Sequence, residues 1–389
     1  MINRFTQRLD IAYPIIQAPM AGVSTPELAA AVSNSGGLGS LGLGASTVSQ
    51  AEALIARTRH LTTQPVNVNL FCHAPARRDP HTEARWTALL RPLFARFGGE
   101  PPETLTEIYQ SFLVNQPMAE LLLDLVPEVV SFHFGVADKT LIRRLKEKGV
   151  VIMASATSVD EALRAVAEGV DMVIAQGYEA GGHRGIFDPH GDDRQMSTLT
   201  LVQALKRTVS IPVIAAGGIM DGAGIRSMMH LGAEGVQLGT AFLLCPESAT
   251  DVGYRQALSG EPAPKTVMTT AISGRPARSI DNAFCETGRR NPGVMPPDYP
   301  LAYDAGKALA AVAKAQGEWG FGAHWAGQGV GMIRALPAAD LMQALIREGG
   351  DVTLDIVDDL GHAIDDRSMQ FALDHLRYTV PKHYFDEAL

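Results

Sequence analysis

A histidine and four glycines lie together in residues 176–185, whose sequence is Gln-Gly-Tyr-Glu-Ala-Gly-Gly-His-Arg-Gly. The apolar residues 172–175 come directly before this stretch. Glycine allows the backbone to approach a ligand closely, and an imidazole gains or loses a proton near neutral pH. The pattern therefore predicts the edge of an active site in which His183 exchanges a proton with the molecule that binds there.

Small and polar residues follow most of the other apolar segments of the chain. If these segments are parallel strands of a barrel, their carboxyl ends lie at one face, where barrel enzymes build their active sites. Glycine-rich turns after the last two strands of such a barrel expose backbone N–H groups to a phosphate. We therefore predict a phosphate cradle formed by Gly217, Gly218, Gly239 and Thr240.

The elements that must position these residues repeat along residues 11–240, where eight short apolar segments alternate with helical patterns. This order favours an α/β fold of the closed (β/α)8 TIM-barrel type over an open doubly wound sheet. The predicted strands are residues 14–20, 39–43, 66–71, 129–134, 150–154, 172–175, 212–215 and 236–238. The predicted helices are residues 26–33, 48–59, 139–147, 158–167, 198–208 and 222–231.

Two long segments depart from this repeat. Residues 241–336 are predicted to form a helical segment on the substrate side that closes the barrel mouth, because connections after barrel strands emerge at the active-site face. The predicted organisation is a barrel over residues 1–240, this closing segment, and a C-terminal extension over residues 337–389. Residues 72–128 replace the third crossover and are predicted to be a mostly helical insertion, with helices at 82–97, 105–115 and 118–125.

Composition limits the class of protein. The 389 residues, 46% of them hydrophobic and 19% charged, suffice for a full-sized core. A formal net charge of −9 with scattered Lys and Arg argues against a nucleic-acid partner. The N-terminus lacks an apolar signal core, and no run of about 18 apolar residues could cross a bilayer. The cysteines, Cys72, Cys245 and Cys285, are too dispersed for a disulfide framework, so we expect a cytoplasmic protein without membrane contact.

Six motifs in order along the chain resemble those of the nitronate monooxygenases, formerly called 2-nitropropane dioxygenases, and more closely their class I bacterial group. The resemblance covers roughly residues 10–335. The motifs are residues 14–22 (Pro-Ile-Ile-Gln-Ala-Pro-Met-Ala-Gly), 67–73 (Asn-Val-Asn-Leu-Phe-Cys-His), 131–135 (Ser-Phe-His-Phe-Gly), 176–185, 215–219 (Ala-Ala-Gly-Gly-Ile) and 237–240 (Gln-Leu-Gly-Thr).

The resemblance implies an FMN-dependent barrel enzyme that oxidises alkyl nitronates, of the propionate 3-nitronate type, with dioxygen and without NAD(P)H. One electron would pass to the flavin and give a semiquinone, and dioxygen would trap the resulting radical pair. The expected products are a carbonyl compound with nitrite and nitrate. Such an activity would serve detoxification.

Carried over to this sequence, the family's cofactor site would place the FMN phosphate in the predicted cradle. The isoalloxazine ring needs a flat wall and polar donors at its edge. The wall would be formed by Met20, Ala21 and Gly22. The polar atoms of the ring and the ribityl chain would be held by Asn69, Gln176, Gly181 and Gln237.

The resemblance gives His183 the role of catalytic base, which would take an α-proton from a neutral nitroalkane. For an anionic nitronate, an imidazolium at this position would instead attract and orient the substrate. The residues expected to bind the nitro and carboxylate groups are His133, Tyr109, Tyr254, Tyr299, Tyr303 and Lys307. The last three are spaced at i, i+4 and i+8, which places them on one face if the segment is helical.

Several of these residues also have structural explanations. His133 could be a core histidine with a backbone partner, and the tyrosine and lysine stripe could be an ordinary amphipathic helix face. Asn67 and Asn69 share one strand face, and we assign Asn69 to the ligand. Cys72 and His73 have no third or fourth ligand at suitable spacing, so we expect them to pack in the core and expect no metal site.

Two other functions stay open at this point. Barrels with similar phosphate turns and a similar start serve as FMN-dependent NADH:quinone or enoyl-thioester reductases, and fold alone does not separate these activities. A flavin-free barrel that binds a phosphosugar or another metabolite would use the same cradle. The sequence also leaves the oligomeric state open, with a homo-oligomer as one alternative.

The C-terminal residues follow a different pattern. Residues 350–365 and 367–378 predict a strand, a turn and a closing helix, similar to the end of α/β-hydrolase esterases. In those enzymes the histidine that matches His362 belongs to a Ser-His-Asp triad. No G-x-S-x-G motif occurs in the chain, so a complete hydrolase is absent.

Overall fold

A computed structural model describes residues 3–350 of the chain. Its centre is an eight-stranded parallel sheet with the order β1-β9-β8-β6-β5-β4-β3-β2. Ile16 in β1 also forms a parallel bridge with Leu38, next to β2, so the two ends of this order meet and the sheet closes. The strands are β1 (Ile15–Gln17), β2 (Gly39–Gly42), β3 (Val66–Phe71), β4 (Val129–His133), β5 (Val151–Ala156), β6 (Met172–Gln176), β8 (Val213–Ala216) and β9 (Gly235–Leu238). The predicted (β/α)8 barrel is confirmed.

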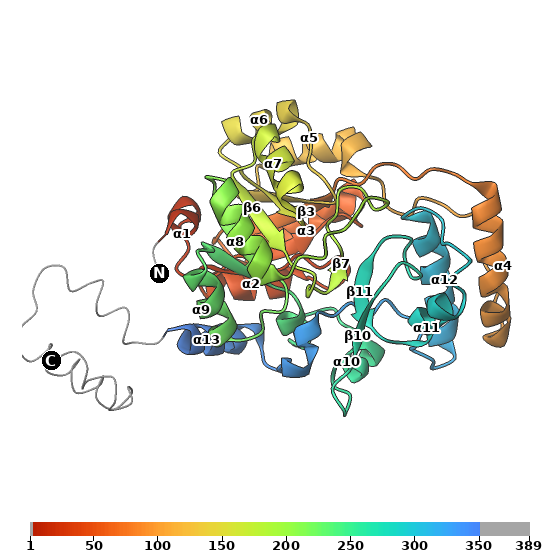
Figure 1. The fold of residues 1–389 in the computed structure, drawn as a ribbon. Coiled ribbons are helices and arrows are strands. Elements are labelled where there is room, and N and C mark those ends of the chain that lie inside the picture. Colours follow the sequence, from red (N-terminus) through yellow and green to blue (C-terminus); the bar gives the residue numbers. More distant parts are fainter. Residues whose placement is uncertain (1–2, 351–389) are drawn as a thin grey trace, which may run out of the picture.

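One helix follows each barrel strand and packs on the outside of the sheet (Figure 1). The strand residues alternate between two apolar clusters, as the pleat of a strand requires. Val129 belongs to the cluster inside the barrel, whereas Val130 packs outward against the helices. Phe5 in α1 (Arg4–Leu9) is fully buried in the inner cluster. The outer helices are α2 (Pro26–Asn34), α3 (Val48–Leu61), α5 (Gln116–Leu125), α6 (Lys139–Glu147), α7 (Val159–Glu168), α8 (Thr198–Thr208), α9 (Gly222–His230) and α13 (Ala338–Gly349).

The last outer helix, α13, corrects the predicted boundary at residue 337. It packs between α9 and α2, the two helices that flank the gap left after β9. Leu341, Met342 and Leu345 are fully buried there. Residues 338–349 therefore complete the barrel and are not part of an added extension. The strand, turn and helix predicted for residues 350–378, including His362, lie outside the described residues except for Gly350.

The segment between β9 and α13 forms a second lobe beside the barrel (Figure 1). It contains a three-stranded antiparallel sheet with the order β10-β11-β7, so the prediction of a helical segment over residues 241–336 was incomplete. This sheet joins β10 (Thr266–Thr269) and β11 (Ala277–Ile280) to β7 (Gly182–His183), which comes from the barrel. The helices of this segment are α10 (Val252–Leu258), α11 (Ala283–Arg290) and α12 (Leu301–Ala315), with short 3-10 turns η2 (Thr240–Phe242) and η3 (Gln328–Met332).

The insertion after β3 divides between the two lobes. Its first helix, α4 (Pro80–Arg96), packs on α12, and the fully buried Leu90 and Leu309 lie in their common core. Its last helix, α5, packs on α3 and α6 and is the ordinary outer helix of the third barrel unit. The insertion proper therefore ends before α5, and not at residue 128 as predicted.

The helix predicted for residues 105–115 does not form. Only the 3-10 turn η1 (Phe112–Val114) is regular there. Asp304 in α12 accepts hydrogen bonds from the backbone N–H and the hydroxyl of Thr106, at 2.9 and 3.0 Å. The Ser111 hydroxyl donates to the carbonyl of His73 at 2.5 Å. Partners far away in the sequence thus hold this segment in an extended course. Within residues 3–350, no helix is both long and apolar enough to cross a membrane.

Candidate active site

A cavity of about 770 Å³ lies where the carboxyl ends of the barrel strands meet the second lobe. It is lined by every residue that the sequence predicted for the site. From the barrel these are Met20, Ala21, Gly22, Asn69, His133, Gln176, Gly181, His183, Gly217, Gly218, Gln237, Gly239 and Thr240. From the insertion and the second lobe they are Tyr109, Tyr254, Tyr299, Tyr303 and Lys307.

His183 lies on β7 and is fixed by the second lobe. Its backbone pairs with Ala277 of β11, and its ring nitrogen Nε2 lies 2.9 Å from the hydroxyl of Ser273. Four aromatic rings surround the imidazole, with centroid distances of 4.9 Å to Trp325, 5.3 Å to Tyr299, 5.6 Å to Phe134 and 5.8 Å to Tyr303. Arg275 is a charged group that acts on this imidazole, and the four aromatic rings make the rest of its surroundings largely apolar.

This environment decides the charge of His183. Burial lowers its pKa well below the ordinary value of 6.5, and His133, Arg275 and His73 lower it further. The ring is therefore neutral at neutral pH, which suits a proton acceptor. The imidazolium expected for an anionic nitronate would need the negative charge of the substrate beside the ring to raise its pKa, and this role stays a prediction.

His133 both lines the cavity and holds the loop that carries His183. Its Nδ1 lies 3.0 Å from the hydroxyl of Ser155, and its Nε2 lies 3.1 Å from the carbonyl oxygen of His183. Burial lowers the pKa of His133 to about 4, so this ring is neutral as well. The two explanations given for His133 from the sequence thus apply together, because one residue faces the cavity and has a backbone partner.

Gln176, at the end of β6, is bonded to the same loop. Its amide nitrogen donates to the carbonyl of His183 at 3.0 Å, and its amide oxygen accepts from the N–H of Gly185 at 2.6 Å. A cofactor polar atom could use the remaining N–H of this amide or the second lone pair of its oxygen. Gln176 therefore connects the barrel to the loop that carries His183, and it also lines the cavity.

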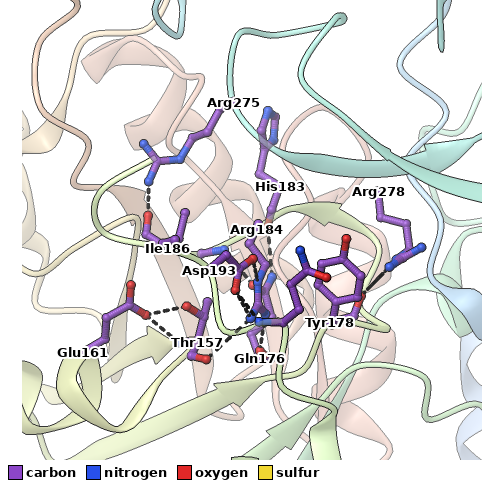
Figure 2. Close-up of polar contacts among 12 residues, drawn as sticks. Thr157, Glu161, Gln176, Tyr178, His183, Arg184, Ile186, Asp193, Arg275 and Arg278 are labelled. Carbon is purple, nitrogen blue, oxygen red and sulfur yellow. Dashed lines mark hydrogen bonds and ion pairs between the residues drawn. The ribbon is translucent and has the colours of Figure 1, made fainter. Parts of the chain in front are cut away.

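Three buried arginines fasten this loop from different sides (Figure 2). Arg184 pairs with Asp193 at 2.8 Å and donates to the carbonyl of Gln176 at 2.6 Å. Arg275 donates to the carbonyl of Ile186, and Arg278 in β11 donates to the carbonyl of Tyr178 at 2.7 Å. Because two of the three come from the second lobe, the position of His183 depends on residues about 90 positions away in the chain.

Two glycines of the predicted phosphate cradle have left-handed backbone conformations. Gly217 and Gly218 have φ angles of 126° and 71°, which side chains other than glycine rarely adopt. The hydroxyl of Thr240 accepts from the N–H of Gly327 at 2.9 Å, so its own proton is free to donate. The side-chain oxygen of Gln237 is buried without a hydrogen-bond partner in the part of the chain that the structure describes, as expected of an atom that meets a cofactor donor.

The structure separates the two asparagines of β3. Asn69 lines the cavity, and its amide nitrogen donates to the hydroxyl of Ser131 at 2.9 Å. Asn67 is fully buried away from the cavity and donates to the hydroxyl of Ser40 at 3.0 Å. Of the two, only Asn69 is placed where it could contact a ligand.

Aromatic residues and one lysine form the wall contributed by the second lobe. Tyr303 and Lys307 lie on α12, and Tyr299 lies just before it. The ammonium of Lys307 is 5.4 and 5.5 Å from the ring centroids of Tyr109 and Tyr303. Burial raises the pKa values of these two tyrosines to about 12, so both keep their protons. Among the residues that line the cavity, Lys307 is the one Lys or Arg, and no Asp or Glu lines it.

Tyr254 differs from the other tyrosines. Its hydroxyl donates to the backbone carbonyl of Trp325, and its ring stacks on His324 with centroids 4.9 Å apart. It lines the cavity, but its polar atom is already used to hold the segment that carries Trp325. A direct contact with substrate would require this hydrogen bond to break or to be shared.

Sequence reasoning missed Ser273, Arg275 and Trp325. The pairing of β7 with β11 brings Ser273 and Arg275 close to His183. No local sequence pattern around residues 273–275 predicts that pairing. Trp325 follows a histidine in a glycine-rich segment, which was the available hint of a cavity wall. His73 packs against Tyr299 with ring centroids 5.0 Å apart. No group of His, Cys, Asp and Glu within residues 3–350 could hold a metal ion.

Comparison with known proteins gives a consistent family. Residues 3–348 match the model of the family described as nitronate monooxygenase. A protein of Paraburkholderia phytofirmans named nitronate monooxygenase is 53% identical over 87% of this chain and 93% of its own length. One of Pseudomonas aeruginosa with the same name is 51% identical over 90% of this chain and 99% of its own length.

Two solved structures are similar to the whole barrel with its second lobe. A nitroalkane oxidase from Streptomyces ansochromogenes has a TM-score of 0.82 and 37% sequence identity, and the match covers 89% of this chain and 98% of that protein. FabK from Thermotoga maritima has a TM-score of 0.69 and 29% identity, and the match covers 92% of this chain and all of that protein.

Proposed function

Because the chain belongs to the nitronate monooxygenase family of oxidoreductases, we propose that its cavity oxidises small alkyl nitronates with dioxygen, with FMN as the cofactor and without NAD(P)H. The products would be a carbonyl compound with nitrite and nitrate. The observation that carries the proposal is a buried histidine inside an aromatic box, formed by Phe134, Tyr299, Tyr303 and Trp325, next to a cavity wall that has one lysine and no carboxylate.

The lining charges support an anionic substrate. A nitronate that also bears a carboxylate, such as propionate 3-nitronate, carries two negative groups. Lys307 would bind one of them, and the hydroxyls of Tyr109 and Tyr303 would donate to the same group or its neighbour. No acidic side chain at the wall opposes this binding. Trp325 and Tyr299, which line the cavity, would exclude water from the reacting carbon.

His183 would act on substrates that arrive uncharged. A neutral nitroalkane has an acidic C–H next to the nitro group, and the imidazole would accept that proton while the C–H pair becomes the C=N bond of the nitronate. The hydrogen bond to Ser273 holds the ring during this transfer. A substrate that arrives as the nitronate needs no such step, so His183 would then serve to orient it within the aromatic box.

The residues around the cradle fit FMN. Gly217, Gly218, Gly239 and Thr240 would hold the phosphate through backbone N–H groups and one hydroxyl. Met20, Ala21 and Gly22 would lie along the ring, and Asn69, Gln176, Gly181 and Gln237 would meet its polar atoms or those of the ribityl chain. When bound, FMN supplies the one-electron acceptor that oxidation of a nitronate requires.

An anaerobic stopped-flow experiment tests this function. Purified protein loaded with FMN is mixed separately with propionate 3-nitronate and with NADH, and the flavin absorbance is followed. The proposal expects the nitronate to change the flavin spectrum, oxygen to restore it, and NADH to have no effect. Rapid bleaching by NADH with no response to nitronate would instead establish a reductase. A protein that takes up no FMN would indicate a flavin-free metabolite-binding barrel.

A further inference from the structure

Arg275 is a buried cation with no ion-pair partner. Its exposed fraction is 2%, and among the described residues no carboxylate lies within ion-pair distance of its guanidinium. One NH2 group donates to the carbonyl of Ile186 (Figure 2). The guanidinium lies 4.1 Å from the centroid of the Phe134 ring. The Nε–H has no hydrogen-bond partner within residues 3–350. Burying a charged group without such partners costs free energy of folding, so we expect this arginine to have a role beyond packing.

The backbone of Arg275 determines which nitrogen of His183 carries the proton. The Ser273 hydroxyl donates to the carbonyl of Arg275 at 3.2 Å. A hydroxyl has one proton, so the same oxygen can only accept from the His183 Nε2, which lies 2.9 Å away. Nε2 therefore carries the ring proton, and Nδ1 keeps the lone pair that a base needs.

The charge of Arg275 acts on the same ring. Phe134 is in contact with both, since its ring lies under the guanidinium and its centroid is 5.6 Å from that of His183. In this apolar surrounding a fixed positive charge disfavours a second one on the imidazole. Glu161 and Asp188 oppose Arg275 only from a longer distance. The other titratable groups that face His183 are His73, His133, Tyr299 and Tyr303.

We propose that Arg275 is a positioning residue for His183: its backbone carbonyl, through Ser273, sets the tautomer with the proton on Nε2, and the charge of its side chain adds to burial in keeping the ring unprotonated. The positive charge reduces the intrinsic basicity of the ring, but it also stabilises the nitronate anion that forms when the α-proton leaves. The catalytic part of this inference rests on the proposed function, whereas the tautomer and the charge state do not.

Arg278 offers a matched control. It is also buried, with an exposed fraction of 3%, it also comes from the β11 region, and it also donates to a backbone carbonyl of the histidine loop. It does not contact Ser273 and is not among the groups that shift the pKa of His183. If Arg275 were only a fastener of the loop, Arg275→Met and Arg278→Met would have similar effects.

The test uses ¹⁵N-histidine-labelled protein and long-range ¹H–¹⁵N spectra over a range of pH, with the His183 signals assigned from His183→Gln. We expect His183 in the unmodified protein to be protonated on Nε2 and to titrate below pH 6.5. In Arg275→Met the guanidinium is lost but the backbone carbonyl stays, so the midpoint should rise by on the order of one pH unit while the ring proton stays on Nε2. Arg275→Lys should stay near the parent protein, and so should Arg278→Met. Thermal unfolding checks that each variant is folded.

Three results would overturn the inference: a His183 in the unmodified protein that titrates near 6.5 or is protonated on Nδ1, an unchanged midpoint in folded Arg275→Met, or an equal shift in Arg278→Met. The first of these results is obtained with the unmodified protein, so the inference can be overturned even if Arg275→Met does not fold. The pH profile of kcat/KM with a neutral nitroalkane should move with the spectra. If no nitroalkane or nitronate is oxidised but the spectra shift as expected, the proposed function fails and the positioning role stands.

Discussion

Burial sets the protonation state of the rings around the reacting position. It lowers the pKa values of His183 and His133, and it raises those of Tyr109 and Tyr303 to about 12. All four side chains are therefore neutral at neutral pH. The ammonium of Lys307 is then the charge at the cavity wall that can balance an anionic substrate.

The lowered pKa of His183 predicts how activity depends on pH. A base works in its unprotonated form, and a pKa below 6.5 means that this form persists when the pH falls through 6.5. We therefore expect kcat/KM for a neutral nitroalkane to stay constant down through pH 6.5 and to fall only at lower pH. His183→Gln should reduce kcat/KM at the plateau by about 10²–10⁴-fold. Initial oxygen consumption with freshly diluted nitroalkane measures both. A decline centred at 6.5 or above would contradict the burial argument.

Lys307 should decide whether a carboxylate on the substrate matters. Lys307→Met removes the ammonium and keeps most of the apolar stem, so kcat/KM for propionate 3-nitronate should fall about 10–100-fold, as for loss of a hydrogen bond to a charged group. An alkyl nitronate without a carboxylate should lose much less. Steady-state oxygen uptake with both substrates gives the ratio.

Lys314 on the same helix is the control for this change. It pairs with Asp251 at 3.0 Å, lies over the Trp319 ring and does not line the cavity. Lys314→Met should leave the ratio of the two substrates unchanged. Equal losses for both substrates in Lys307→Met would mean that the lysine supports the fold of α12 and does not recognise the carboxylate.

At the scale of elements, the segment from Trp325 to η3 lines the cavity together with the residues of the predicted phosphate cradle. Gln328 N–H donates to the carbonyl of Glu179 at 2.9 Å, and Gly327 N–H donates to Thr240. The segment thus joins the wall next to His183 to the turn proposed for the phosphate. Its close approach depends on Gly181, because a Cβ there would lie 2.5 Å from the backbone nitrogen of Gly327.

Gly181→Ala should therefore separate this segment from the histidine loop. Backbone atoms cannot move aside cheaply, so we expect a loss of about 1–3 kcal/mol in the free energy of unfolding, together with weaker FMN binding. Denaturant unfolding and titration with FMN measure the two effects. Gly293→Ala is a control, since a Cβ there meets nothing within 4 Å. Unchanged stability and FMN affinity in Gly181→Ala would show that the segment adapts.

The elements that sequence patterns located well are those whose contacts are local or repeat. The strand at 66–71 and the helices at 139–147 and 198–208 were predicted with the bounds that the structure shows. The hairpin β10–β11 was missed because all four residues of β10 are only half buried, which weakens the alternation that marks a strand. Residues 105–115 were predicted as a helix because Asp304 and His73, which hold them extended, lie far away in the sequence.

The same distinction applies to the site. Residues at the ends of barrel strands, such as Asn69 and Gly217, could be placed from the order of strands, because parallel strands of a barrel end at one face. Ser273 and Arg275 could not, since they reach His183 only through the antiparallel pairing of β7 with β11. Their roles, like those of the other site residues, stay predictions until they are tested.

For the whole molecule, the barrel supplies the cavity residues that we propose to bind FMN, and the second lobe supplies most of those that we propose to bind the substrate. The second lobe is inserted between β9 and its outer helix α13, so the chain must return to the barrel after building it. The barrel is therefore complete only when α13 has packed between α2 and α9. This topology makes the end of the described chain a structural requirement for the site.

Two truncations test this requirement. A chain that ends at Leu336 loses α13, whose Leu341, Met342 and Leu345 are fully buried, and each such side chain contributes about 1.5–3 kcal/mol. We expect it to aggregate or to unfold at a much lower temperature and to retain no FMN. A chain that ends at Gly350 keeps α13 and every residue of the cavity, so its thermal midpoint, its FMN content and its nitronate oxidation should match the full chain. Loss of FMN in both chains would mean that residues 351–389 contribute to the barrel or its site.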